Sequence, residues 1–160
     1  MTLTVPGRYD KKLLGLYVVL EQVNGAFLEQ RFGTDKGLLL KPERSLSMLY
    51  LGEAFAEYER VYIPKSSTKP RLAKRLIAFT WLVNQADMAF AEKIGDFVEL
   101  ERLARFTAVH AVLSHLDSFL LRGHNYYLYL PKASGRFVFL PWDLNSTFAS
   151  HRSECSPERQ

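Results

Sequence analysis

The feature that most constrains this chain is a β-hairpin with polar residues at both ends. Residues 126–130 and 136–140 are aromatic and aliphatic runs, and the small, turn-forming residues 132–135 separate them. This pattern predicts two antiparallel strands joined by a tight turn. Asn125 precedes the first strand and Asp143 lies just beyond the second, where backbone pairing ends and side chains can reach a ligand. Sites that bind a metal and a nucleotide place polar residues in this way.

The upstream sequence predicts alternating strands and helices. Residues 15–23 are rich in β-branched and aromatic side chains, which favours a strand. Asn24 is a candidate N-cap for a helix that runs to Phe32 and ends at Gly33. Residues 37–41 form a second apolar run that ends in Lys41. We therefore expect strand, helix and strand in that order.

Two amphipathic helices are predicted in the middle of the chain. Between residues 71 and 94, apolar side chains recur every three or four residues. Gly95 is expected to end this helix. Asp96 is expected to cap a second helix with the same periodicity, whose apolar face continues on either side of Asp117. Residues 64–70 read as an exposed loop and residues 151–160 as a polar, frayed tail.

The carboxylate that follows the hairpin is the strongest candidate for a metal ligand. Asp143 comes after a long apolar run, and a carboxylate is costly to bury there unless it is paired, hydrogen-bonded or bound to a metal. Mg²⁺ favours one or two carboxylates, completed by phosphate oxygens and water. The alternative is an Asx turn or a helix cap, which Asn145-Ser146-Thr147 makes credible.

The other polar candidates also have structural alternatives. Lys41 could reach phosphate groups with its ammonium held by Glu21, or it could extend into solvent from the end of a strand. Asp117 could orient an acceptor hydroxyl, or it could pair with Arg122. Asn125 could bind a metal through its amide oxygen, or it could satisfy backbone groups at the entrance to the hairpin.

These residues together resemble the CotH family of atypical protein kinases found in spore coats. Protein kinases present a catalytic aspartate, a metal-binding asparagine and a metal-binding aspartate in the same order as Asp117, Asn125 and Asp143. The resemblance covers about residues 14–150. It is carried by Gly15 to Val23, Phe27-Leu28, Arg31-Phe32-Gly33, Gly37 to Lys41, Asp117, Asn125 to Tyr129 and Pro141-Trp142-Asp143.

The resemblance implies an α+β, protein-kinase-like core in which antiparallel strands pack against the two amphipathic helices. It implies ATP and Mg²⁺ as cofactors and a Ser/Thr-containing protein, such as a spore-coat component, as the acceptor. Lys41 and Glu21 would bind the nucleotide, Asp143, Asn125 and Asn145 would hold the metal, and Asp117 would be catalytic. The family commonly has a second acidic residue where this chain has Asn145, and a Gly where it has Ala149. One negative charge is therefore lost at the metal site.

Size and charge limit the other possibilities. A chain of 160 residues with 48% hydrophobic content fits one domain, so we expect residues 1–160 to form a single, partial CotH-like domain. The net charge of +4 mildly favours anionic partners. Basic residues between Arg60 and Arg75 suggest a solvated surface or, alternatively, a site for an acidic protein or nucleic acid. Nucleic acid is disfavoured because interleaved stacking aromatics are missing.

The sequence leaves open where in the cell the protein is located and whether it catalyses a reaction. We expect no transmembrane segment or signal peptide, and the family resemblance points to a spore coat or a cell surface. A single cysteine, Cys155, excludes an intrachain disulfide. The main alternative function is a catalytically inactive, kinase-like protein that acts in coat assembly or adhesion. Transfer of AMP rather than phosphate also remains open, because both reactions begin from the same metal nucleotide.

Overall fold

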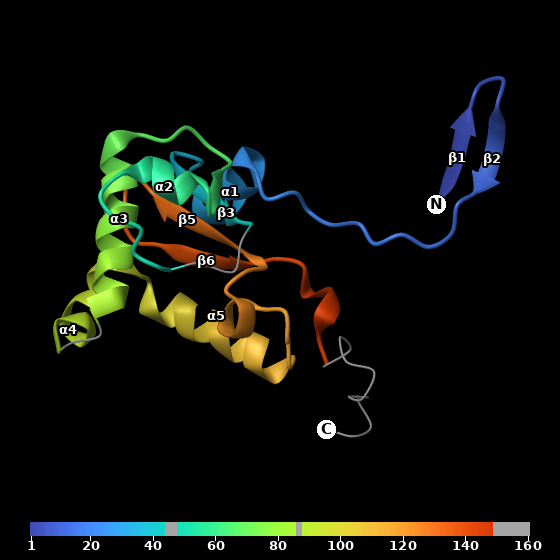
Figure 1. Cartoon of the computed structure of the whole chain (residues 1–160). Coiled ribbons are helices and arrows are strands. Elements are labelled where there is room, and N and C mark those ends of the chain that lie inside the picture. Colours follow the sequence, from blue (N-terminus) through green and yellow to red (C-terminus); the bar gives the residue numbers. More distant parts are fainter. Residues whose placement is uncertain (44–47, 86–87, 149–160) are drawn as a thin grey trace.

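A four-stranded antiparallel sheet forms the centre of the chain (Figure 1). The computed structural model describes residues 1–43, 48–85 and 88–148. The sheet has the order β4-β3-β5-β6, with β3 at Gly37–Pro42, β4 at Tyr62–Pro64, β5 at Tyr126–Pro131 and β6 at Val138–Pro141. Tyr126 pairs with Pro141, and Tyr129 pairs with Val138. The predicted hairpin and the predicted strand ending near Lys41 are both confirmed.

The two faces of this sheet pack against different helices. Alternate residues of β3 and β5, such as Leu40 and Leu128, face the larger core, which also contains Leu76 and Phe79 of α3 (Pro70–Gln85). The intervening residues, such as Leu39 and Tyr127, face a smaller core with Leu28 of α1 (Gly25–Phe32). Both β3 and β5 are buried almost throughout because each face of the sheet is covered.

Helix α1 forms at the predicted place and for the predicted reason. The side chain of Asn24 accepts a hydrogen bond from the backbone N–H of Phe27, which satisfies one of the free donors of the first turn. Gly33 ends the helix with φ 70°, a left-handed conformation that glycine adopts without steric cost. The remaining short helices are α2 (Phe55–Glu59), α6 (Phe119–Arg122) and the 3₁₀ turn η1 (Leu144–Ser146).

The predicted division between the two long helices is wrong. The expected helix over residues 71–94 corresponds to α3 and α4 (Met88–Phe97), which lie on either side of residues 86–87. Gly95 and Asp96 lie inside α4, and the next helix, α5, begins only at Leu100 and runs to Val112. The chain is redirected at Val98, which forms a parallel bridge with Phe137 beside β6. This long-range pairing, rather than the local glycine, ends α4.

The predicted strand over residues 15–23 is also wrong. The segment has no regular secondary structure and pairs with no strand in the described part of the chain. Leu16, Val18 and Val19 are 101%, 83% and 94% exposed. It connects the main sheet to a small hairpin of β1 (Thr2–Val5) and β2 (Tyr9–Leu13), which stands apart from the rest of the chain in Figure 1. That the whole chain makes one domain stays a prediction. The polar tail, Ala149 and Cys155 lie outside the described residues.

Candidate active site

The end of the hairpin opposite its turn brings Asn125 and Asp143 to the same edge of the sheet. Asn125 directly precedes β5, and Asp143 lies two residues beyond Pro141, the last residue of β6. The backbone N–H of Trp142 donates to the carbonyl oxygen of Asn125 at 3.1 Å, which extends the hairpin by one further bond. Both residues have left-handed backbones, with φ 60° at Asn125 and φ 50° at Asp143. Asn and Asp tolerate this conformation better than most residues, and it is common at functional sites.

Asn125 holds Asp117 directly. Its amide nitrogen donates to the carboxylate Oδ2 of Asp117 at 2.9 Å and to the backbone carbonyl of the same residue at 2.7 Å. The amide oxygen of Asn125 takes no part in these two hydrogen bonds. The side chain thus satisfies a backbone group, as one alternative predicted, and also fixes the orientation of a carboxylate.

Two nitrogen-bearing side chains, those of His124 and Arg122, lie near the other oxygen of Asp117. His124 Nε2 lies 3.2 Å from Oδ1, and Arg122 Nε lies 3.6 Å from the same atom. The Asp117 side chain is only 25% exposed, whereas that of Arg122 is 56% exposed. The predicted pairing with Arg122 is therefore present but is the longer of the two contacts. Sequence reasoning did not assign a role to His124, although it stands next to Asn125.

Asp143 does not cap the turn that follows it. It occupies the N-cap position of η1, yet its side chain forms no capping hydrogen bond. The carboxylate is exposed at the end of the sheet. Two residues on, the side-chain Oδ1 of Asn145 accepts a hydrogen bond from Ser146 Oγ at 3.1 Å. Asp143 is consequently more available for a metal ion than Asn145.

A buried histidine, His115, lies near this edge of the sheet. His115 is 2% exposed, and burial is the main reason that its pKa lies below the ordinary value, with His110 adding to the effect. Asp117 and Asp143 both oppose this shift of the His115 pKa, so both carboxylates act on the same imidazole. Asn125 binds Asp117 and also accepts a backbone hydrogen bond from Trp142, the neighbour of Asp143, so these three polar residues lie at one edge of the sheet although they are far apart in the sequence. His115 could be singled out from the sequence only by its position two residues before Asp117.

A mainly apolar cavity of about 680 Å³ opens beside this group. Asp143, Asn145 and Glu21 supply its polar side chains. The apolar walls come from the extended segment before α1, from α1 itself and from the end of β6: Val18, Leu20, Val23, Phe27, Leu140, Pro141, Trp142 and Leu144. Its volume falls within the range of small-molecule and cofactor sites, which are mostly apolar with a few polar groups.

Lys41 lies on the face of the sheet that borders this cavity. In β3, Leu39 and Lys41 alternate with Leu40, and Leu39 pairs with Tyr129, so Lys41 shares a face with Tyr127. Burial raises the pKa of Tyr127, and the nearby charge of Lys41 opposes that rise. The ring of Tyr127 packs edge-on against Trp142 with their centroids 5.3 Å apart, and Trp142 lines the cavity.

The structure does not pair Lys41 with Glu21. The ammonium of Lys41 lies 3.1 Å from the Glu43 carboxylate, and Glu21 instead contacts Arg31 of α1 at 2.9 Å. Glu43 follows Lys41 by two residues, so the alternation of an extended chain could have revealed it. The strand that was expected to carry Glu21, over residues 15–23, does not form.

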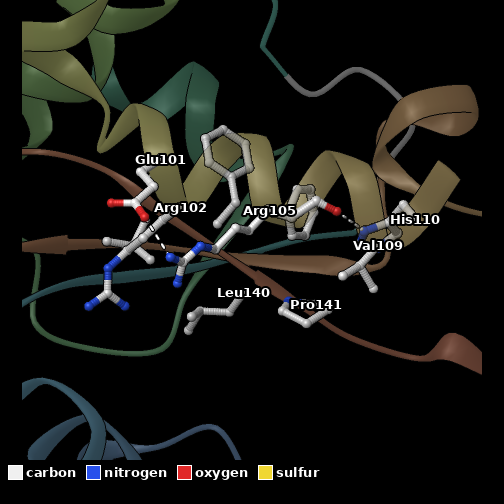
Figure 2. A pocket seen from close by; sticks show the side chains of 10 residues that line it. Glu101, Arg102, Arg105, Val109, His110, Leu140 and Pro141 are labelled. Carbon is white, nitrogen blue, oxygen red and sulfur yellow. Dashed lines mark hydrogen bonds and ion pairs between the residues drawn. The ribbon is translucent and has the colours of Figure 1, made fainter. Parts of the chain in front are cut away.

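A second cavity, between α5 and β6, contains none of the predicted site residues (Figure 2). Its volume is about 460 Å³. Both of its guanidinium groups are already paired: Arg102 with Glu99 at 2.8 Å and Arg105 with Glu101 at 2.5 Å. His110 Nδ1 is bound to the carbonyl oxygen of Phe106 at 2.7 Å. These contacts are internal to α5 and its N-terminal boundary, and they stabilise the helix.

The oxygen ligands at the end of the hairpin fit a hard cation that takes its remaining ligands from phosphate or water. Among the described residues, no group of three or more His, Cys, Asp or Glu side chains is arranged to hold a metal ion. Asp143 offers one exposed carboxylate, and Asn125 offers an amide oxygen near the same edge. Mg²⁺ bound to phosphates requires no more protein ligands than this.

Comparison with known proteins identifies the family of the chain. A family model described as "CotH kinase protein" matches residues 4–159, nearly the whole chain. A search of curated proteins found no match. Within the described part of the chain, every helix is too short or too polar to cross a membrane.

Proposed function

The chain belongs to the CotH kinase family, and from this premise we propose that it transfers the γ-phosphoryl group of ATP to a Ser or Thr hydroxyl of a protein, such as a spore-coat component. The observation that carries the proposal is the grouping of Asp117, Asn125 and Asp143 beside an apolar cavity at one end of the sheet. Phosphoryl transfer asks mainly for positioning and charge neutralisation; this grouping would position the acceptor and hold the cation that neutralises the phosphates.

Each candidate residue has a role that its surroundings support. Asp143 and Asn125 would hold Mg²⁺, with Asn145 as a further oxygen donor. Lys41, on the adjoining face of the sheet, would bind phosphate oxygens after exchanging its contact with Glu43. Glu21 lies on the cavity wall, where it would contact the nucleotide rather than Lys41. Bound Mg²⁺ supplies neutralisation of the charge on the phosphates.

Asp117 is the residue proposed to act on the acceptor. Asn125 and His124 each hold one of its two carboxylate oxygens, so the side chain has one fixed orientation. A fixed carboxylate can accept a hydrogen bond from the incoming hydroxyl and align its oxygen for attack. The proton of the acceptor hydroxyl passes to Asp117 as the new ester bond to phosphorus forms and ADP leaves.

A second candidate function is a kinase-like protein without turnover that acts in coat assembly or adhesion. Two observations favour it. Asn145 stands where the family commonly has an acidic side chain, and its amide oxygen already accepts a hydrogen bond from Ser146. Lys41 is held by a carboxylate on its own segment rather than by one on the cavity wall.

The two functions are separated by incubating the protein with Mg²⁺, a mixture of acceptor proteins and ATP labelled at either the α- or the γ-phosphate. Asp143→Ala is the test variant, and Asp10→Ala, which removes an exposed carboxylate from β2, is the matched control. Transfer of the γ-label by the wild type and by Asp10→Ala, but not by Asp143→Ala, is the expected result. Transfer of the α-label would show an AMP transferase. ATP binding without transfer of either label would favour the non-catalytic function.

A further inference from the structure

A row of exposed cations lies at the end of the sheet opposite the candidate active site. Lys132 follows β5 and Lys36 precedes β3, and the backbone N–H of Lys132 donates to the carbonyl oxygen of Lys36 at 2.9 Å. Asp143 follows β6, which runs antiparallel to β5, so Lys132 and Asp143 lie at opposite ends of the hairpin. Figure 1 shows α3 beside the end where β5 finishes and η1 beside the other end.

Three shallow cavities form a continuous groove along α3. The first, of about 300 Å³, is lined by Lys36, Lys69 and Lys132, and it shares Lys132 and Leu72 with the second, of about 460 Å³. The second shares Lys74 and Ala78 with the third, of about 450 Å³, which ends at Trp81. A row of small depressions fits an extended chain better than it fits one compact small molecule.

The exposed stripe of α3 explains why the groove is continuous. Arg71, Lys74, Ala78 and Trp81 follow one another at spacings of three and four residues, so they lie on one side of the helix. Leu76 and Phe79, on another side of the helix, are buried in the larger core. From Arg71 to Trp81 the helix rises about 15 Å. An extended peptide of about five residues covers that length.

Most cations of the groove form no ion pair within the described part of the chain. Among the described residues, no carboxylate forms an ion pair with any of five exposed cations of the groove: Lys36, Lys69, Arg71, Lys74 and Lys132. Elsewhere, the cations of α5 are paired with glutamates in or next to their own helix. Asp35 lies at one end of the groove and Glu53 at the end near Trp81.

We propose that this groove along α3 is a docking site for an acidic polypeptide segment. Its carboxylates contact the cations between Lys69 and Lys132, and an apolar side chain of the segment packs on Trp81, which is 47% exposed. Exposed aromatic residues of this kind are enriched where proteins bind each other. The groove is separate from the candidate active site, so the partner can bind whether or not the chain transfers phosphate.

The composition of the groove favours a polypeptide over nucleic acid. Trp81 is the single aromatic residue among the side chains that line the three cavities, whereas strand-tracking sites stack successive bases on several aromatics. Glu53 beside Trp81 would repel a phosphate backbone at that end. An acidic peptide can place its charges at the lysines and an uncharged residue at the tryptophan.

The test measures binding of fluorescein-labelled peptides to the purified chain by anisotropy, without nucleotide. The first peptide has four glutamates followed by two alanines and two leucines, and the second has glutamine in place of each glutamate. Lys74→Glu combined with Lys132→Glu is the test variant, and Trp81→Ala tests the apolar end. Lys12→Glu on β2 is the control for charge reversal, because β2 stands apart from α3 in Figure 1.

We expect saturable binding of the glutamate peptide that weakens with added salt and falls about tenfold in the double variant. Lys12→Glu retains the affinity, and Trp81→Ala lowers it about threefold. All the substituted side chains are exposed, and unchanged thermal unfolding of each variant confirms that it is folded. Equal binding of the glutamine peptide, no loss in the double variant, or no binding to the wild type would overturn the proposal. Tighter binding of a ten-nucleotide single-stranded DNA, or of phosphatidylserine vesicles, would overturn it in favour of another anionic partner.

Discussion

Removing the Asn125 side chain tests whether it holds Asp117 in place. Asn125 has φ 60°, so the informative substitution is Asn125→Gly, which keeps the left-handed backbone accessible while deleting the amide. Two hydrogen bonds are lost, one to the carboxylate and one to the backbone carbonyl of Asp117. A bond to a charged group contributes about 1.5–3 kcal/mol and a neutral one about 1 kcal/mol.

Solvent reduces the size of this loss. The Asp117 side chain is 25% exposed, so water replaces part of each bond, and we expect Asn125→Gly to lower the free energy of unfolding by about 2 kcal/mol. Asn125→Ala should cost about 1 kcal/mol more, because alanine is strained in the left-handed region. Urea unfolding followed by circular dichroism measures both values.

A double-mutant cycle with Asp117→Ala isolates the contact itself. If Asn125 acts on Asp117, the combined variant should lose about 1 kcal/mol less than the sum of the single losses. Additivity within about 0.3 kcal/mol would refute the direct contact. A loss below about 0.5 kcal/mol in Asn125→Gly would refute the argument from hydrogen bonding altogether.

Two further predictions concern stability. Burial lowers the pKa of His115, so the folded chain keeps this imidazole neutral while the unfolded chain takes up a proton near its ordinary pKa of about 6.5. The free energy of unfolding should therefore be fully retained above about pH 6.5 and fall as the pH decreases below it, and His115→Gln should reduce that fall. Urea titrations between about pH 5 and pH 7.5 measure it, and an unchanged pH dependence in the variant would contradict the assignment. A Cβ added at Gly37 would overlap the backbone of Leu130 and the ring of Tyr129, so Gly37→Ala should cost about 2–4 kcal/mol. Gly95→Ala is the matched control. Gly95 lies inside α4, a Cβ added there would be 3.6 Å from a side-chain carbon of Leu100, and alanine should stabilise the chain by about 0.5–1 kcal/mol. Similar thermal unfolding of Gly37→Ala and Gly95→Ala would refute the steric argument.

The hairpin and α1 were predictable because their causes are local. Turn residues between two apolar runs determine the pairing of β5 with β6, and the side chain of Asn24 caps the helix that it precedes. The position of Asp143 at the end of the sheet follows from these local features. Its role as a metal ligand stays a prediction, as do the roles of Lys41, Glu21, Asp117, Asn125 and Asn145.

The two wrong predictions, the strand over residues 15–23 and the helix end at Gly95, share a different cause. Residues 15–23 have strong β-propensity, but a strand also needs a neighbour with which to form hydrogen bonds, and none pairs with this segment. Gly95 looked like a helix end, yet the boundary is set two residues later, where Phe137 N–H donates to the carbonyl oxygen of Phe97 at 2.6 Å. A contact between residues 40 positions apart leaves no local trace in the sequence.

The sequence alone determined the family resemblance, the hairpin and the identity of the polar residues at its ends, because these depend on residue type and short spacing. Only the tertiary structure decided which side chains meet. It placed Glu43 rather than Glu21 on Lys41, brought Asp117 to the side-chain amide of Asn125, and aligned the cations around α3 with Lys132. Such contacts depend on sheet register and helix packing, which are set by the burial of apolar side chains across the whole fold.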